Sequence, residues 1–286
     1  MKDERRIADR FRDFVTKRGE YIEDHLSNGW ELEKLFYRDF YSTDVDNLKY
    51  REEDPETRKL KADYDKMVEM MMADLLKEGR RSRKMAPVIF NEWVNCEING
   101  GAESAGKKGI GRLYLNLKPE QVPGFFDEMA KKIEKSGARV LMQMPATGGA
   151  QVFNRFDKMS IQFGAGDEKE ILETIGDLDE SMFEPQIPRF SAAVKNSEGR
   201  FVKGIGFGED PVFKGQSFGI VRSRILADVY NRAKSFGKMA DDPEFDFNGA
   251  FKKVSGEYGV DLENPAFNKP KSEGEETFPE MRMRTS

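Results

Sequence analysis

The chain has 286 residues, with 52 acidic and 47 basic side chains and a formal net charge of −5. This mildly acidic balance argues against a general nucleic-acid-binding protein, which would carry a basic surplus. The only cysteine, Cys96, excludes an intrachain disulfide, and the only histidine, His25, argues against Ser–His–Asp, Cys–His and histidine-rich metal sites. No apolar run reaches the length of a membrane span, and the N-terminus lacks the apolar core of a signal peptide. We therefore expect a cytoplasmic protein without a metal, another cofactor, a nucleic-acid partner or a membrane partner.

The first 96 residues are predicted to be helical. Apolar residues recur there at helical spacing in three stretches, 7–15, 32–36 and 64–75. Pro55 suits the first position of the third helix, and Gly79 suits its end. The basic run "GRRSRK" at 79–84 follows, and it is either a solvated helix end or a contact for a phosphate or an acidic peptide.

Alternating apolar and polar residues begin after a glycine-rich stretch at 99–111, whose spacing does not fit a P-loop. Such alternation is typical of strands with one covered face. It predicts strands of one sheet at 111–117, 139–144, 158–163, 188–194 and 201–207. Helices are predicted to cover one face of this sheet, at 119–136, after Asp167, at 217–236 and at 247–258. The other face carries polar side chains, among them Arg112 and Gln143, and is either a binding surface or simply solvated.

These patterns predict an α+β fold, in which a mostly antiparallel sheet is covered on one face by helices and a helical N-terminal region is attached. The predicted boundaries are 1–96 for the helical region and 97–267 for the α+β domain. The remaining residues, 268–286, are polar, contain two prolines and show no periodicity, so they are predicted to form a disordered tail.

The helix predicted at 217–236 begins with arginines where acidic residues are expected. Ser217 is a natural N-cap, but Arg222 and Arg224 follow before any acid does. Guanidinium groups match phosphate oxygens, and the N–H groups of a helix N-terminus favour the same anion. Two interpretations stay open. Either these arginines help to hold a phosphate at the helix N-terminus, or they point sideways to acidic partners.

Five segments of the chain carry a resemblance to a known family. They are "RLYLNL", "NRFDKMSIQF", "PRFSAAV", "GIGFGEDP" and "GQSFGIVRSRILADVY", across roughly residues 110–235. Their order and approximate spacing resemble those of the HopA-type effector family of plant-pathogen type III effectors. The chain is also similar to the HopA-like lyases of class V lanthipeptide and thioamitide biosynthesis. An "R-x-D" before a strand, followed by "SFG-x-x-R" before a helix, is the most specific part of the resemblance.

The resemblance implies a phosphate elimination. In the lyases a kinase partner phosphorylates serine or threonine in a peptide, and the lyase expels the phosphate and leaves a dehydroamino acid. By resemblance, Arg155 and Arg222 bind the phosphate and Asp157 orients Arg155. Further candidate phosphate-binding residues are Arg112, Ser217 and Gly219. Resemblance to the effectors implies delivery into a host cell and a secretion chaperone as partner.

The chain departs from the lyase pattern at the position of the general base. The lyases tend to carry a lysine in the strand before "R-x-D", where this chain has Gln143. Lys158 and Gln143 are the candidate catalytic residues. Lys158 is the candidate base that replaces the missing lysine, and the other lysines that would serve are Lys107, Lys108 and Lys203. Three functions therefore stay open: a phosphoserine or phosphothreonine lyase, a non-catalytic phosphate- or phosphopeptide-binding protein, and an effector-like protein-interaction module.

Overall fold

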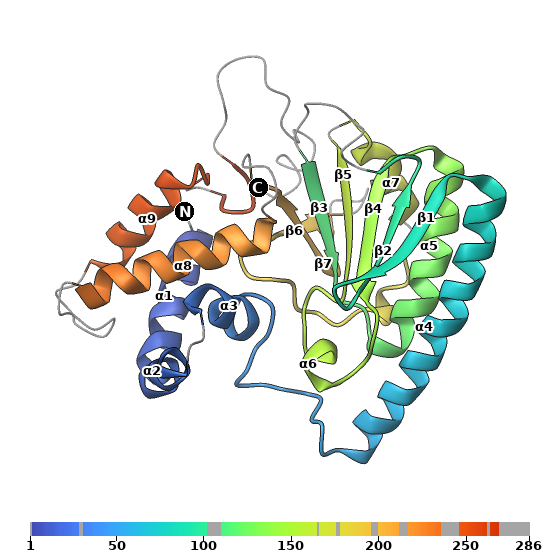
Figure 1. Ribbon diagram of the computed structural model, residues 1–286. Helices are drawn as coiled ribbons and strands as arrows, with labels where there is room; N and C mark the ends of the chain where they lie inside the picture. Colours follow the sequence, from blue (N-terminus) through green and yellow to red (C-terminus); the bar gives the residue numbers. More distant parts are fainter. Residues whose placement is uncertain are drawn as a thin grey trace. The chain divides into compact units, whose positions relative to one another are not determined.

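The computed structural model describes residues 2–28, 31–101, 110–164, 166–175, 178–195, 200–211, 217–235, 246–261 and 264–268 (Figure 1). The chain divides into two compact units, which are described separately. The helical unit contains Met1–Val45, Pro188–Ala192 and Gly208–Glu273, and the sheet unit contains Asp46–Ile187 and Ala193–Phe207. The predicted tail lies outside the described residues except for Asn268. The backbone N–H of Asn268 donates to Glu209 Oε2 at 2.8 Å, so ordered structure extends at least to this residue.

The sheet has seven strands in the order β1-β2-β4-β5-β3-β7-β6 (Figure 1). Their bounds are Met85–Phe90 (β1), Trp93–Ile98 (β2), Ile110–Leu115 (β3), Val140–Pro145 (β4), Met159–Gly164 (β5), Ala192–Lys195 (β6) and Phe201–Glu209 (β7). The pairs β1–β2, β2–β4, β4–β5 and β5–β3 are antiparallel. The predicted α+β class with a mostly antiparallel sheet is therefore confirmed. The strand predicted at 188–194 is corrected, because β6 begins only at Ala192. A turn precedes it, in which the Ser191 N–H donates to the Pro188 carbonyl at 3.2 Å.

The hairpin formed by β1 and β2 corrects the prediction that the first 96 residues are helical. Helix α4 ends at Ser82, and two strands follow. They are joined by Asn91 and Glu92, whose φ angles of 49° and 66° are those of a two-residue type I′ turn. The sequence analysis missed the hairpin because "MAPVIF" does not alternate, and its proline argues against a strand.

Two helices cover one face of the sheet. Helix α4, Pro55–Ser82, packs on β1, and helix α5, Val122–Ser136, packs on β4 and β2 (Figure 1). The shorter elements of this unit are η3 (Pro119–Gln121), α6 (Ala150–Phe153), α7 (Glu168–Ile175) and η4 (Glu180–Met182). Buried side chains of α4, α5 and alternate strand positions form the core; examples are Leu75, Phe126, Cys96, Met142 and Ile161. The sheet face away from α4 and α5 is called the outer face below.

The helical unit is built around aromatic side chains. Its helices are α1 (Lys2–Lys17), α2 (Gly19–Ser27), α3 (Leu32–Phe36), the π-helical turn η1 (Tyr37–Tyr41), α8 (Phe218–Ser235) and α9 (Phe247–Glu257). The Phe11 ring lies 4.9 Å from Phe36 and 5.1 Å from Phe40, between ring centroids. Helix α8 packs on α3, η1 and α9. It therefore belongs to the helical unit, whereas the sequence analysis placed it on the sheet, because an apolar stripe does not say which element it faces.

Replacing Gly204 by alanine is expected to destabilise the fold. Gly204 has a φ of 69°, and a Cβ there would lie 2.2 Å from the backbone oxygen of Glu184. Left-handed strain and the clash together should cost at least about 2 kcal/mol. Gly124→Ala on α5 is the matched control, since its Cβ meets nothing within 4 Å. It should leave the free energy of unfolding unchanged or raise it by up to about 1 kcal/mol. Urea denaturation of both variants tests this, and equal midpoints would contradict it.

Candidate functional site

A buried lysine lies at the junction of two paired strands. Lys158 precedes β5 and Asn116 follows β3, and the register that pairs Leu115 with Met159 brings the two opposite each other. The Lys158 side chain is 1% exposed. Its Nζ donates to Asn116 Oδ1 and, at 2.8 Å, to Glu184 Oε2. The amine is therefore held by one neutral and one charged oxygen in a nearly dry environment.

The same carboxylate connects this lysine to the surface. Glu184 Oε1 accepts a hydrogen bond from Lys49 Nζ at 2.8 Å and one from the Tyr50 hydroxyl at 3.3 Å. The Glu184 side chain is 14% exposed, and that of Lys49 is 62% exposed. Lys49, Tyr50, Asn116, Lys158 and Glu184 form a continuous group, here called the lysine cluster. It contains two lysines and one carboxylate.

Burial and the charge balance of the lysine cluster shift its pKa values. Burial is the main cause that lowers the pKa of Lys158 below that of a free lysine, and the charge of Lys49 adds to this, while Glu184 opposes it. Burial alone would raise the pKa of Glu184, but Lys158 and Lys49 lower it below its usual range. Burial raises the pKa of Tyr50, so its hydroxyl stays a hydrogen-bond donor in the neutral range. An amine with a lowered pKa is the type of group that accepts a proton in general base catalysis.

Arg155 and Asp157 lie in the loop that leads into β5. Arg155 Nε donates to Asp157 Oδ1 at 2.9 Å and Nη2 donates to Oδ2 at 2.8 Å, a bidentate pair. The guanidinium also lies 5.2 Å from the centroid of the Trp93 ring. The arginine is thus fixed in direction by a carboxylate and a ring, with 15% of its side chain exposed. The expected roles of phosphate ligand and orienting residue stay predictions.

Gln143 and Arg112 meet on the outer face of the sheet. Arg112 Nη1 donates to Gln143 Oε1 at 2.9 Å, and Gln143 Nε2 donates to Asn95 Oδ1 at 2.7 Å. The three side chains come from β3, β4 and β2. The amide of Gln143 carries no titratable group, so it cannot serve as the proton acceptor that the lyase pattern has at this position, and its predicted catalytic role is corrected on that point.

The arginines of α8 belong to the helical unit and differ sharply from each other. The Arg222 side chain is 0% exposed; its Nε donates to the Pro265 carbonyl at 3.0 Å, and its guanidinium lies 4.4 Å from the Phe218 ring centroid. A phosphate would therefore have to reach a fully buried group, and the predicted phosphate-binding role of Arg222 stays a prediction. Arg224 points sideways, and its Nε donates to Glu33 Oε2 at 2.5 Å.

The N-terminus of α8 receives an acid from outside the helix. The backbone N–H of Phe218 donates to Asp210 Oδ1 at 3.1 Å. Ser217 Oγ accepts a long hydrogen bond of 3.5 Å from the Ile220 N–H, and Gly219 packs under Tyr37, whose ring would lie 2.6 Å from an added Cβ. Asp210 therefore supplies the negative charge that the first turn of α8 lacks.

The predicted site residues lie in separate groups. Lys158, Arg155 and Asp157 share one loop, and Gln143 contacts Arg112, all in the sheet unit; the predicted convergence with Arg222 of the helical unit stays a prediction. The alternative bases divide as follows: Lys107 and Lys108 lie outside the described residues, and Lys203 is exposed on β7. Lys49, Tyr50 and Glu184 were not predicted from the sequence. They lie in segments that have no helical or strand periodicity and match no motif.

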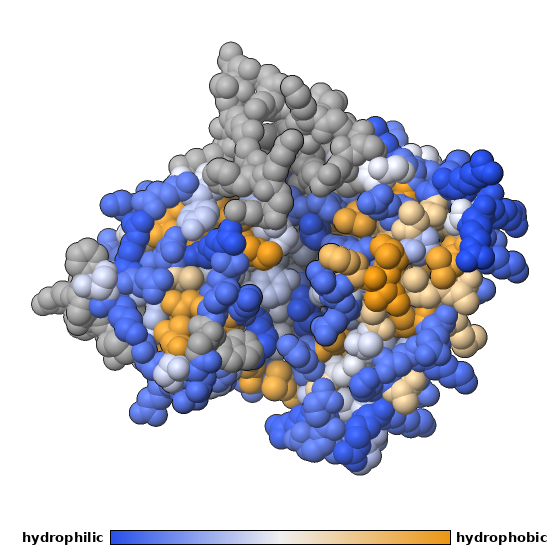
Figure 2. All heavy atoms as spheres, in the orientation of Figure 1, coloured by the Kyte–Doolittle hydropathy of each residue, from blue (hydrophilic) through white to orange (hydrophobic). Residues whose placement is uncertain are grey.

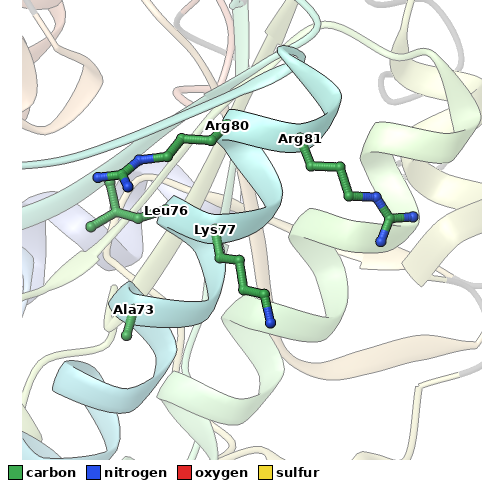
Figure 3. A pocket seen from close by; sticks show the side chains of 5 residues that line it. All are labelled: Ala73, Leu76, Lys77, Arg80 and Arg81. Atoms are coloured by element: carbon green, nitrogen blue, oxygen red, sulfur yellow. The ribbon is translucent and has the colours of Figure 1, made fainter.

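Helix α4 ends at Ser82 and not at Gly79 as predicted, so the basic run at 79–84 begins inside the helix. A hollow on α4 is lined by Ala73, Leu76, Lys77, Arg80 and Arg81. Figure 3 shows that the ends of Lys77, Arg80 and Arg81 point in three directions. A single phosphate needs donors that converge on it, so the solvated-end interpretation of this run fits better.

Other classes of site find little support among the described residues. Cys96 is buried, and burial raises the pKa of its thiol to about 12, so it is no nucleophile at neutral pH. The described ranges contain no group of three or more His, Cys, Asp or Glu residues suited to a metal ion. Within the same ranges, no helix has the length and apolar character needed to cross a membrane.

Comparison with known proteins gives a family and a fold. The model of the HopA1 effector protein family matches residues 96–267. The structure of the effector protein from Pseudomonas syringae pv. syringae strain 61 is similar, with 14% identity, a TM-score of 0.58, and coverage of 94% of this chain and 98% of that chain. The structure of the effector protein from Pseudomonas syringae pv. tomato strain DC3000 is also similar, with 13% identity and a TM-score of 0.50. The match covers 83% of this chain and 89% of that chain. No curated protein sequence matches. At these identities the structural likeness shows the fold alone.

Arg222→Ala is expected to destabilise the protein, whereas Arg224→Ala is not. The first change empties a fully buried site and removes contacts with Pro265 and Phe218, which should cost about 3 kcal/mol. The second removes a partly exposed ion pair worth at most about 1 kcal/mol. The burial of Arg222 and the exposure of Arg224 are the reason for the expected difference. Thermal unfolding of the two variants measures the difference, and similar losses would contradict it.

Glu184→Gln is expected to lower stability in a pH-dependent way. At neutral pH the change leaves Lys158 buried without its counter-charge, which should cost about 3 kcal/mol. Because the pKa of Glu184 is lowered in the folded state, its contribution is complete above the unfolded value of 4.5 and is lost as the pH falls through the folded value. The stability difference from the parent should therefore shrink below about pH 4.5. A constant difference across the acid range, measured by urea denaturation, would exclude this coupling.

Proposed function

The chain belongs to the HopA1 effector protein family, and we propose that it eliminates phosphate from phosphoserine or phosphothreonine in a peptide or protein. The observation that carries this proposal is the buried Lys158, an amine whose pKa is lowered by burial and by a second lysine. Elimination needs a base for the α-proton of the phosphorylated residue, and a lysine serves once its pKa approaches the working pH. A kinase supplies the phosphorylated substrate in this scheme.

The reaction balances with the groups of the sheet unit. Lys158 Nζ takes the α-proton, the electron pair of the Cα–H bond forms the Cα=Cβ double bond, and the Cβ–O bond breaks. Phosphate leaves with the electrons of that bond. Arg155 carries a positive charge in the same loop, three residues before the base, and is suited to the leaving phosphate.

The other residues of the lysine cluster position Lys158 and control its protonation in this scheme. Asn116 holds Lys158 Nζ through a neutral oxygen, which fixes its direction without adding charge. Lys49 and Glu184 lie between this amine and the solvent, so substrate binding has to draw the Glu184 carboxylate aside. As it moves aside, the carboxylate takes up the Lys158 proton, which leaves Nζ neutral and able to accept the α-proton. Tyr50, which donates to the same carboxylate, is then suited to hold the substrate carbonyl oxygen.

A second function is favoured by the residue at position 143. An amide stands where the resemblance places a lysine, and it is engaged with Arg112 and Asn95. A protein that binds phosphopeptides without reacting with them would need no base there. As an effector, such a protein would act in a host cell by sequestering a phosphorylated partner, with a secretion chaperone before delivery.

Mass spectrometry of phosphopeptides incubated with the protein separates the two functions. The parent should convert phosphoserine or phosphothreonine peptides to products that have lost phosphoric acid. Lys158→Met should reduce the rate at least about 100-fold, while Lys203→Met, at an exposed alternative base on β7, should leave it unchanged. Far-ultraviolet circular dichroism checks that the Lys158→Met protein is folded. Binding without any product supports the second function, and full activity of a folded Lys158→Met protein excludes Lys158 as the base.

A further inference from the structure

Exposed apolar side chains gather at one edge of the sheet's outer face. Val88 and Phe90 of β1 are 53% and 65% exposed. The hairpin register pairs Phe90 with Trp93 and Val88 with Asn95, so these side chains project from the outer face beside the first residues of β2. Figure 2 shows hydrophobic surface over β1, β2 and β4. Val88, Phe90 and Trp93 are called the apolar shelf.

The apolar shelf is continuous with the candidate site. The Arg155 guanidinium lies 5.2 Å from the Trp93 ring centroid, and Trp93 is the cross-strand neighbour of Phe90. The Arg155 guanidinium, which is paired with Asp157, thus stands at one end of an exposed apolar strip. Surface of this kind suits a ligand with an anionic group next to a bulky apolar one, because each half of the ligand finds its complement.

We propose that the apolar shelf binds an extended phosphopeptide that carries a bulky apolar residue two positions from its phosphorylated residue. In an extended chain, side chains two residues apart project to the same side, roughly 7 Å apart. That spacing lets one side chain reach Arg155 while the other rests on Phe90 and Val88. The inference rests on the proposed function only for the phosphate, and it adds a sequence preference for the substrate.

The size of the apolar shelf favours a peptide over a second copy of the chain. A stable protein–protein interface buries roughly 800 Å² on each partner. Two exposed side chains on one strand supply only a fraction of that area, which is enough to receive one apolar side chain of a peptide.

Trp93 provides a built-in reporter for the experiment. The chain has two tryptophans, so Trp30→Phe leaves Trp93 as the only one. Fluorescence titration would compare two phosphoserine peptides that differ only in leucine or glycine two positions from the phosphoserine. We expect the leucine peptide to bind about tenfold more tightly. The double variant Val88→Ser, Phe90→Ser should reduce its affinity to that of the glycine peptide. Phe201→Ser is the matched control, since Phe201 is 59% exposed on β7, and it should change nothing.

The outcomes distinguish this inference from the proposed function. Tight, leucine-dependent binding without loss of phosphate supports the apolar shelf and contradicts the lyase. Loss of phosphate at equal rates from both peptides supports the lyase and overturns the shelf. Equal affinities for both peptides, or an unchanged affinity in the double variant, also overturn it. Gel filtration adds a further check: a dimer that the double variant disperses would assign the shelf to self-association and reject the peptide.

Discussion

A buried ammonium group must be matched by oxygen atoms, and this constraint organises the sheet unit around Lys158. Its two partners come from different parts of the chain, Asn116 at the end of β3 and Glu184 in the segment before β6. The Glu184 backbone is tied as well, because its N–H donates to the Asn116 carbonyl at 2.8 Å. Satisfying one charge therefore fixes how three separate stretches meet, and it leaves the cluster with one more cation than anion.

The two faces of the sheet differ in how deeply their side chains are buried. Alternate residues of β2, β4 and β5 are buried against α4 and α5 and supply the apolar free energy of folding. The residues between them project from the outer face, where Gln143, Arg112 and Trp93 are partly exposed. A surface of this type can change its ligand chemistry without changing its fold.

Segments whose apolar residues recur with a regular period could be predicted from the sequence, and segments without such a period could not. Alternation located the strands from β3 onward to within a few residues, and five short segments sufficed for the family. The β1–β2 hairpin was missed because Pro87 and a run of consecutive apolar residues hide its period. Glu184 was missed for a different reason: a single carboxylate becomes a partner of Lys158 only through tertiary contacts. The difference between Arg222 and Arg224 could not be predicted for the same reason, because the sequence "VRSR" does not indicate which of the two side chains is buried.

Pro87 has a consequence for the behaviour of the protein at high concentration. The two-residue turn makes Phe90 and Trp93 a hydrogen-bonded pair, and such pairs alternate along an antiparallel ladder. Pro87, three residues back, thus falls where the backbone nitrogen faces outward from the sheet. At that point a strand from another molecule finds no N–H donor and meets the ring instead. An edge strand that is hydrophobic on its exposed face is ordinarily a template for aggregation. Here Pro87 removes one of the outward-facing donors, which weakens the pairing of another strand along this edge.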